Sequence, residues 1–192
     1  YIGGAVLNLW KPKPQYQQWQ ALGEKWLMNR ASKLIMQDGG FSQYSINYHR
    51  VMLDSYCLAE IVRQKFELKP LSGQLYRQLK KATDWLYVLT QADGDAPNLG
   101  ANDGARLIPV SQTDYRDFRP TVQLASTLFF QHSYYAEKGG YDQTLEFFDL
   151  SKQQKSDFEL PNISMLRYSF AVLLTNLNYQ LIRAKLQTLH HY

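Results

Sequence analysis

Apolar residues recur at helical spacing in four successive segments, and this periodicity constrains the fold more than any other feature of the chain. The four stripes run over about residues 19–35, 47–65, 71–89 and 120–129. Apolar side chains three and four positions apart line one face of a helix, which must then pack against a neighbour. Turn-forming residues follow the first and third stripes, at 38–40 and 93–97. We therefore expect a mainly α-helical fold of antiparallel helices joined by long loops.

The ends and faces of two of these helices can be predicted in more detail. Ser45 or Asn47 is placed to cap the second helix, and Pro120 stands at a favourable first-turn position of the fourth. The apolar side of the second helix is expected to hold Val51, Leu58, Val62 and Phe66.

The segment from Gly94 to Arg119 has little periodicity of its own. Loops of about 25 residues in compact domains are usually either functional or disordered. This one is rich in Leu, Ile, Val, Tyr and Phe, which argues against a disordered linker. We expect an ordered loop that helps to form a site.

The pattern changes from Asn162 onward. Two runs rich in β-branched and aromatic residues, 164–175 and 179–186, flank the turn-prone stretch 175–178. This arrangement suggests a β-hairpin. Periodicity alone leaves one long helix over 163–188 as the alternative.

Composition restricts the classes of function. Of the 192 residues 45% are hydrophobic, as in a globular domain, and no apolar run reaches the roughly 20 residues of a membrane helix. The net charge of +4 includes no basic block, so we expect no nucleic-acid partner. Cys57 is the single cysteine and is expected to be a buried thiol. No cysteine and histidine cluster at zinc spacing is present, and we expect neither a metal nor a cofactor.

Chemically versatile side chains are densest between residues 38 and 50, where a glycine turn leads into a helix start. This segment supplies neutral hydrogen-bonding groups, two phenols, an imidazole and a cation, from Gln43, Tyr44, Asn47, Tyr48, His49 and Arg50. The alternative is that Tyr48 and His49 only cap and pack the start of the helix.

The run Gln37–Arg50, followed by Met52-Leu53-Asp54, resembles a segment of the heparinase II/III-like polysaccharide lyases. That segment reads Asp-Gly, then Glu or Gln, Ser, two residues, and Tyr-His-Arg. The stretch Pro97–Arg106 is similar to the family's second site loop, at about the expected distance. With the helices, the resemblance covers about residues 15–130, and Met165–Tyr168 looks like the strand that opens the family's β-sandwich.

The resemblance implies a fold and a setting for the chain. Residues 1–160 would form part of an (α/α) toroid, and residues 161–192 would be the opening strands, a hairpin, of a β-sandwich domain. The remainder of the same polypeptide would supply upstream helices and the rest of the sandwich. The isolated chain is then expected to lack activity, and the whole protein to be periplasmic or secreted.

The resemblance also implies an activity, the cleavage of a uronic-acid-containing anionic polysaccharide by β-elimination. Tyr48 would be the general acid, and often also the base, with His49 as a second catalytic residue. His49 and Arg50 are candidates for cations that lower the pKa of the phenol. Since consecutive helix residues diverge by about 100°, at most one of them should face the same cleft.

Further residues are expected to bind the substrate. Arginines of the loop suit carboxylates or sulfates, amides and Asp103 suit hydroxyls or the support of Tyr48, and tyrosines suit stacking on sugar faces. The expected set comprises Gln43, Tyr44, Asn47, Arg50, Asn102, Asp103, Arg106, Tyr115 and Arg116, with Arg119 and Trp10 as further candidates.

The chain departs from the family pattern at some points. Ala101 stands where the family's loop commonly has Asp, and the family's Asn-His element and sandwich histidine have no aligned counterpart here. Two other functions therefore stay open. One is a non-catalytic glycan-binding or scaffold domain with a structural Tyr48. The other is a glycoside hydrolase, which needs two carboxylates flanking a cleft, drawn from Asp38, Asp54, Asp95 and Asp103.

Overall fold

The computed structural model describes residues 1–155, 159 and 161, and this part of the chain is mainly helical. Its elements are α1 (Ile2–Trp10), α2 (Pro14–Leu34), α3 (Ile46–Lys65), α4 (Gly73–Leu89), α5 (Arg119–Phe130), the 3₁₀ helix η1 (Gly140–Asp142) and α6 (Gln143–Phe147). Between α2 and α3, Ile35 and Phe41 form an isolated antiparallel bridge across the glycine turn. The expectation of a mainly α fold is confirmed.

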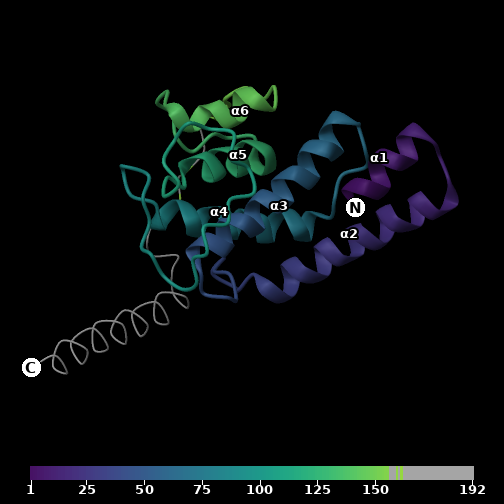
Figure 1. Cartoon of the computed structure of the whole chain (residues 1–192), viewed down its shortest axis with the longest axis horizontal. Helices are drawn as coiled ribbons and strands as arrows, with labels where there is room; N and C mark the ends of the chain where they lie inside the picture. The colour runs from purple at the N-terminus through teal and green to yellow at the C-terminus, as the bar shows by residue number, and fades with distance from the viewer. Residues whose placement is uncertain (156–158, 160, 162–192) are drawn as a thin grey trace, which may run out of the picture.

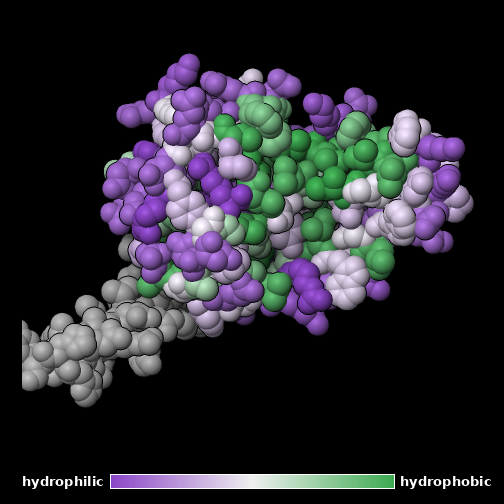
Figure 2. All heavy atoms as spheres, viewed as in Figure 1, coloured by the Kyte–Doolittle hydropathy of each residue, from purple (hydrophilic) through white to green (hydrophobic). Residues whose placement is uncertain are grey.

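The helices pack in a continuous series. Helices α1 and α2 lie side by side at one end, α3 and α4 occupy the centre, and α5 packs on both α3 and α4 with α6 beyond it (Figure 1). Their main core gathers apolar residues of α3, α4 and α5, among them Leu53, Leu79, Leu86 and Val122. Apolar side chains also reach the surface over α1 and α3 (Figure 2). Among the described residues, no helix has the length and apolar character needed to cross a membrane.

The four helices expected from periodicity are all present, with caps of the expected kind. Ser45 Oγ accepts a hydrogen bond from the Tyr48 amide at 3.1 Å, so the expected capping role of Ser45 is confirmed. Pro120 lies in the first turn of α5. Three short elements, α1, η1 and α6, were not expected, because stretches of three to nine residues carry too few periodic positions to reveal a helix.

The expected apolar side of α3 is wrong in part. Phe66 is 41% exposed and Val51, Leu58 and Val62 are only half-buried. The buried positions of α3 instead include five polar residues besides Leu53 and Cys57, namely Asn47, His49, Arg50, Asp54 and Glu60. Burial of polar groups is tolerated when hydrogen bonds or ion pairs satisfy them. Glu60, for example, accepts hydrogen bonds from Arg63 and from Tyr76 Oη.

The stripe on α2 is also packed along only part of its length. Ala31 is buried, whereas Trp19, Leu22 and Trp26 are 45%, 51% and 47% exposed. Within the described residues, α1 covers part of this helix: a Cβ added to Gly4 of α1 would lie 2.5 Å from the Gln20 backbone nitrogen.

The long loop between α4 and α5 is anchored to the start of α3. The Ile46 amide donates to Leu99 O at 3.3 Å, and Ser45 Oγ donates to Ala101 O at 2.6 Å. Gly100 has a φ of +73°, and a Cβ there would lie 2.3 Å from Tyr44 O. Glycine allows both the left-handed backbone and this close approach. The loop therefore lies against the polar segment singled out in the sequence.

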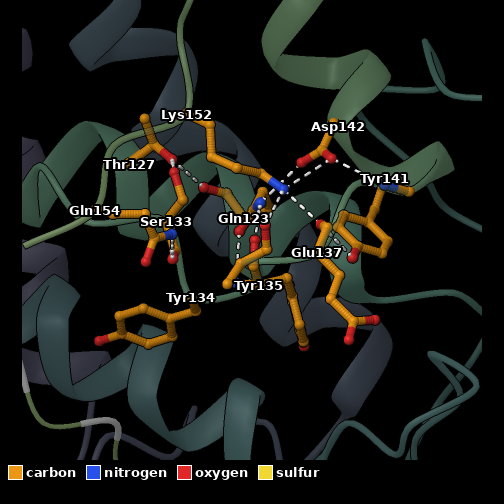
Figure 3. Close-up of polar contacts among 12 residues, drawn as sticks. Gln123, Thr127, Ser133, Tyr134, Tyr135, Glu137, Tyr141, Asp142, Lys152 and Gln154 are labelled. Atoms are coloured by element: carbon orange, nitrogen blue, oxygen red, sulfur yellow. Dashed lines mark hydrogen bonds and ion pairs between the residues drawn. The ribbon is translucent and has the colours of Figure 1, made fainter.

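A polar network fastens the chain after α5 to that helix (Figure 3). Gln123 Nε2, on α5, donates to Tyr135 O at 2.9 Å and to Asp142 Oδ1 at 2.8 Å. Asp142 Oδ2 pairs with Lys152 Nζ at 3.0 Å. These contacts fix the position of η1 and hence of α6, which follows it directly.

The predicted hairpin and the strand at 165–168 lie outside the described residues, as does nearly all of the predicted domain 161–192. The toroid and the division into two domains stay predictions.

Candidate functional site

The candidate site lies at the first turn of α3, where the loop 97–106 crosses it. Tyr48 Oη donates a hydrogen bond to Asp103 Oδ2 at 2.6 Å. Asn47 Nδ2 lies 3.5 Å from the other carboxylate oxygen of Asp103. Asp103 is exposed, and Tyr48 is half-buried. The structure thus brings together residues of the two segments that carry the family resemblance.

This contact sets the protonation of both groups. The hydrogen bond from Tyr48 is the main cause of a lowered pKa at Asp103, and the same bond raises the pKa of Tyr48. A carboxylate stabilises the neutral phenol and opposes the phenolate. The expectation that nearby cations lower the pKa of Tyr48 is therefore wrong. Tyr48 is a protonated phenol at neutral pH, which suits a proton donor.

Arg50 supports the site from the inside. Its guanidinium donates to Tyr115 O at 2.5 Å, to Asn47 Oδ1 at 2.7 Å and to Ala105 O at 3.3 Å. It also lies over the rings of Tyr115 and Phe118, 4.5 and 4.7 Å from their centroids. Arg50 is only 1% exposed, so it presents no surface for the substrate contact expected from the sequence. Its role here is to join α3 to the loop.

Tyr115 extends this support toward the surface. Its Oη lies 2.9 Å from Asn47 Oδ1 and 2.5 Å from Asn102 Oδ1. Asn102 is exposed and also contacts Asn98 through its amide nitrogen. A phenol has a single proton to donate, so the two amide oxygens share it. Tyr115 therefore holds both the buried Asn47 and the exposed Asn102, and its hydroxyl is already engaged.

His49 does not belong to the site, and its predicted catalytic role is corrected. The ring is fully buried, stacks on Trp85 at 4.6 Å between centroids and contacts Ala82 O through Nε2 at 2.8 Å. Burial lowers its pKa to about 4. The imidazole is thus neutral and donates from Nε2 into α4. Since one residue step on a helix turns a side chain by about 100°, Tyr48 reaches the loop while His49 enters the core.

The two loop arginines expected to bind substrate hold the loop itself. Arg106 Nη2 donates to Ser111 Oγ at 2.7 Å. Arg116 pairs with Asp95 at 2.5 Å and donates to Ala96 O at 2.8 Å. Arg119 likewise pairs with Asp117 at 2.9 Å. Each is half-buried, and the contacts found are within the loop or at its end.

The remaining candidates face solvent. Gln43 and Tyr44 are exposed in the turn before α3, and Tyr44 has a φ of +52°. Of the loop candidates, Asn102 and Asp103 are also exposed. Trp10, at the end of α1, is 83% exposed. Among the described residues, no three His, Cys, Asp or Glu side chains are grouped closely enough to hold a metal ion.

Asp54 was expected only as a candidate carboxylate of the hydrolase alternative, and its buried position behind the site was not expected. This carboxylate is 1% exposed, accepts a hydrogen bond from Thr121 Oγ1 at 2.8 Å and lies one helical turn after Arg50. Burial is the main cause that raises its pKa to about 6. The sequence pattern that could have indicated this position is the polar series at 47, 50 and 54, because residues at this spacing share one face of a helix.

No family model, curated protein or solved structure matches this chain.

Proposed function

We propose that the chain carries the proton-donating side of the active site of a polysaccharide lyase, which cleaves an anionic, uronic-acid-containing polysaccharide by β-elimination. Tyr48 is the general acid in this proposal. The observation that supports it best is the hydrogen bond from Tyr48 to Asp103, because it joins the two segments of the family resemblance at an exposed position.

The chemistry requires a proton donor of this kind. In β-elimination a base removes the C-5 proton of the uronate, the electron pair forms the C-4 to C-5 double bond, and the bond from C-4 to the glycosidic oxygen breaks. The Tyr48 hydroxyl, which donates to Asp103 before the reaction, turns to the departing oxygen and gives it the proton. A phenol whose pKa is raised stays protonated until this step, and Asp103 orients it beforehand.

Neutral donors in the two segments fit the second requirement of the reaction. The C-5 proton becomes acidic only when donors stabilise negative charge on the adjacent carboxylate. The exposed amides of Gln43 and Asn102 are candidates for that contact. The buried Asn47 and Arg50, together with the half-buried Tyr115, would keep Asn102 and Asp103 in place during the reaction.

The hydrolase alternative receives less support. Two carboxylates must flank the scissile bond in that mechanism. Asp103 is exposed, but Asp54 is buried and Asp95 is paired with Arg116. Asp38 accepts a hydrogen bond from the Gly40 amide within the glycine turn. A non-catalytic glycan-binding domain stays open, since the same exposed groups bind sugars without any reaction.

The test is a substrate survey with the intact protein. It is incubated with a glycosaminoglycan, alginate and an acidic bacterial polysaccharide, with a neutral glucan as the matched control. We expect ultraviolet absorbance from unsaturated uronate with at least one acidic polymer and none with the glucan. New reducing ends without that absorbance would indicate a hydrolase. Retention of an acidic polymer without cleavage would indicate a binding domain.

A further inference from the structure

A small cavity lies behind the candidate site, between α3, the loop, α5 and α6. Its volume is about 10 Å³, close to what a single water molecule requires. The polar residues in its lining are Arg50, Asp54, Arg106, Asp117, Thr121 and Thr144. Two arginines and two aspartates balance in charge, so the lining does not call for an ion.

Two of the lining residues carry buried polar atoms without a hydrogen-bond partner among the described residues. They are Arg50 Nε and Thr144 Oγ1, and both residues are 1% exposed. Nearly all buried polar groups in folded proteins are hydrogen-bonded, either to protein or to ordered water. The Nε–H of Arg50 is a donor, and the hydroxyl of Thr144 both donates and accepts.

Asp54 supplies an acceptor in the same cavity. Its Oδ1 accepts from Thr121 Oγ1 at 2.8 Å, and a carboxylate has room for further hydrogen bonds on both oxygens. A guest molecule in this space thus meets one donor, one hydroxyl and one carboxylate. Two to four such partners are what a buried water molecule usually has.

We propose that this cavity is a binding site for one structural water molecule. The water accepts a hydrogen bond from Arg50 Nε–H, donates one to the Asp54 carboxylate and exchanges one with the Thr144 hydroxyl. It completes the contacts of the guanidinium that holds Asn47 and the Tyr115 carbonyl. Through Thr144 it links α6 to the helix that bears Tyr48. The inference does not depend on the proposed function.

The direct test is a crystal structure of the intact protein at a resolution that places ordered waters. We expect a water about 2.7 to 3.2 Å from Arg50 Nε and about 2.5 to 3.0 Å from Thr144 Oγ1. A direct hydrogen bond from Arg50 Nε to Asp54 or Thr144, with the cavity closed, would overturn the proposal.

A solution measurement tests the same water through a matched pair of variants. Thr144→Val keeps the shape of the side chain and removes the hydroxyl, whereas Thr144→Ser keeps the hydroxyl. The exchange of the Arg50 Nε–H proton with solvent is followed by NMR. We expect exchange about fivefold faster or more in Thr144→Val than in Thr144→Ser, since one hydrogen bond of the water is lost. Equal exchange rates in the two variants would contradict the proposal.

Discussion

Replacing His49 by Phe should remove a pH-dependent part of the protein's stability. The imidazole is fully buried against Trp85, and burial lowers its pKa from 6.5 to about 4. A histidine whose pKa is depressed in the folded state contributes its full stabilisation at pH values above its pKa in the unfolded chain. That stabilisation is lost as the pH falls toward the folded value, because the unfolded chain takes up the proton more readily.

The size of the effect follows from the interval between the two pKa values. One pKa unit corresponds to about 1.4 kcal/mol. Between about pH 7.5 and about pH 4.5, His49 should therefore cost the wild-type protein about 2 to 3 kcal/mol of unfolding free energy. Phenylalanine preserves an aromatic ring for the contact with Trp85 and does not titrate.

The assay is urea unfolding of both proteins at the two pH values, followed by tryptophan fluorescence. The quantity of interest is the pH-induced loss of stability in wild type minus the loss in His49→Phe, since other titrating groups cancel in that difference. We expect a difference of about 2 to 3 kcal/mol. The same pH dependence in both proteins would refute the placement of a neutral His49 in the core.

Three further predictions follow from other residues. The pH dependence of stability that Asp54 causes has the opposite sign, because burial raises its pKa from 3.8 to about 6. Relative to Asp54→Asn, the wild-type protein should gain about 2 to 3 kcal/mol of unfolding free energy as the pH falls from about 7 to about 4, measured by the same unfolding assay. Gly100→Ala should lower the melting temperature more than Gly104→Ala. Both glycines have positive φ, but only at Gly100 would the new Cβ meet backbone, at 2.3 Å from Tyr44 O. Equal losses of melting temperature would show that this contact does not matter. Asp103→Asn should lower the pKa of Tyr48, observed by NMR titration of ¹³C-labelled tyrosine, and an unchanged pKa would mean that the carboxylate is not its cause.

The positions of the long helices could be predicted from the sequence, because apolar spacing and caps such as Ser45 act over a few neighbouring residues. The contact between the turn before α3 and the loop was expected only through resemblance. Its physical basis, the approach of Gly100 to Tyr44, depends on residues far apart in the chain.

The roles of individual side chains were harder to predict. Tyr48, His49 and Arg50 are adjacent in sequence but end in three environments: the site surface, the α4 interface and the buried support of the loop. Which of them is buried depends on the elements that cover each face of α3. Hydrophobicity suggested a face of α3 that is only partly buried. The more deeply buried positions include polar groups, which partners on other elements stabilise, as Thr121 does for Asp54.

The central claim, that Tyr48 donates the proton, is tested most directly by the turnover of Tyr48→Phe in the intact protein on its acidic polymer. Tyr16→Phe, which removes a phenol from α2, is the control. We expect turnover by Tyr48→Phe to fall about 10²- to 10⁴-fold, as for the loss of a positioned acid, with polymer affinity and melting temperature close to wild type. Near-normal turnover in Tyr48→Phe would contradict the account.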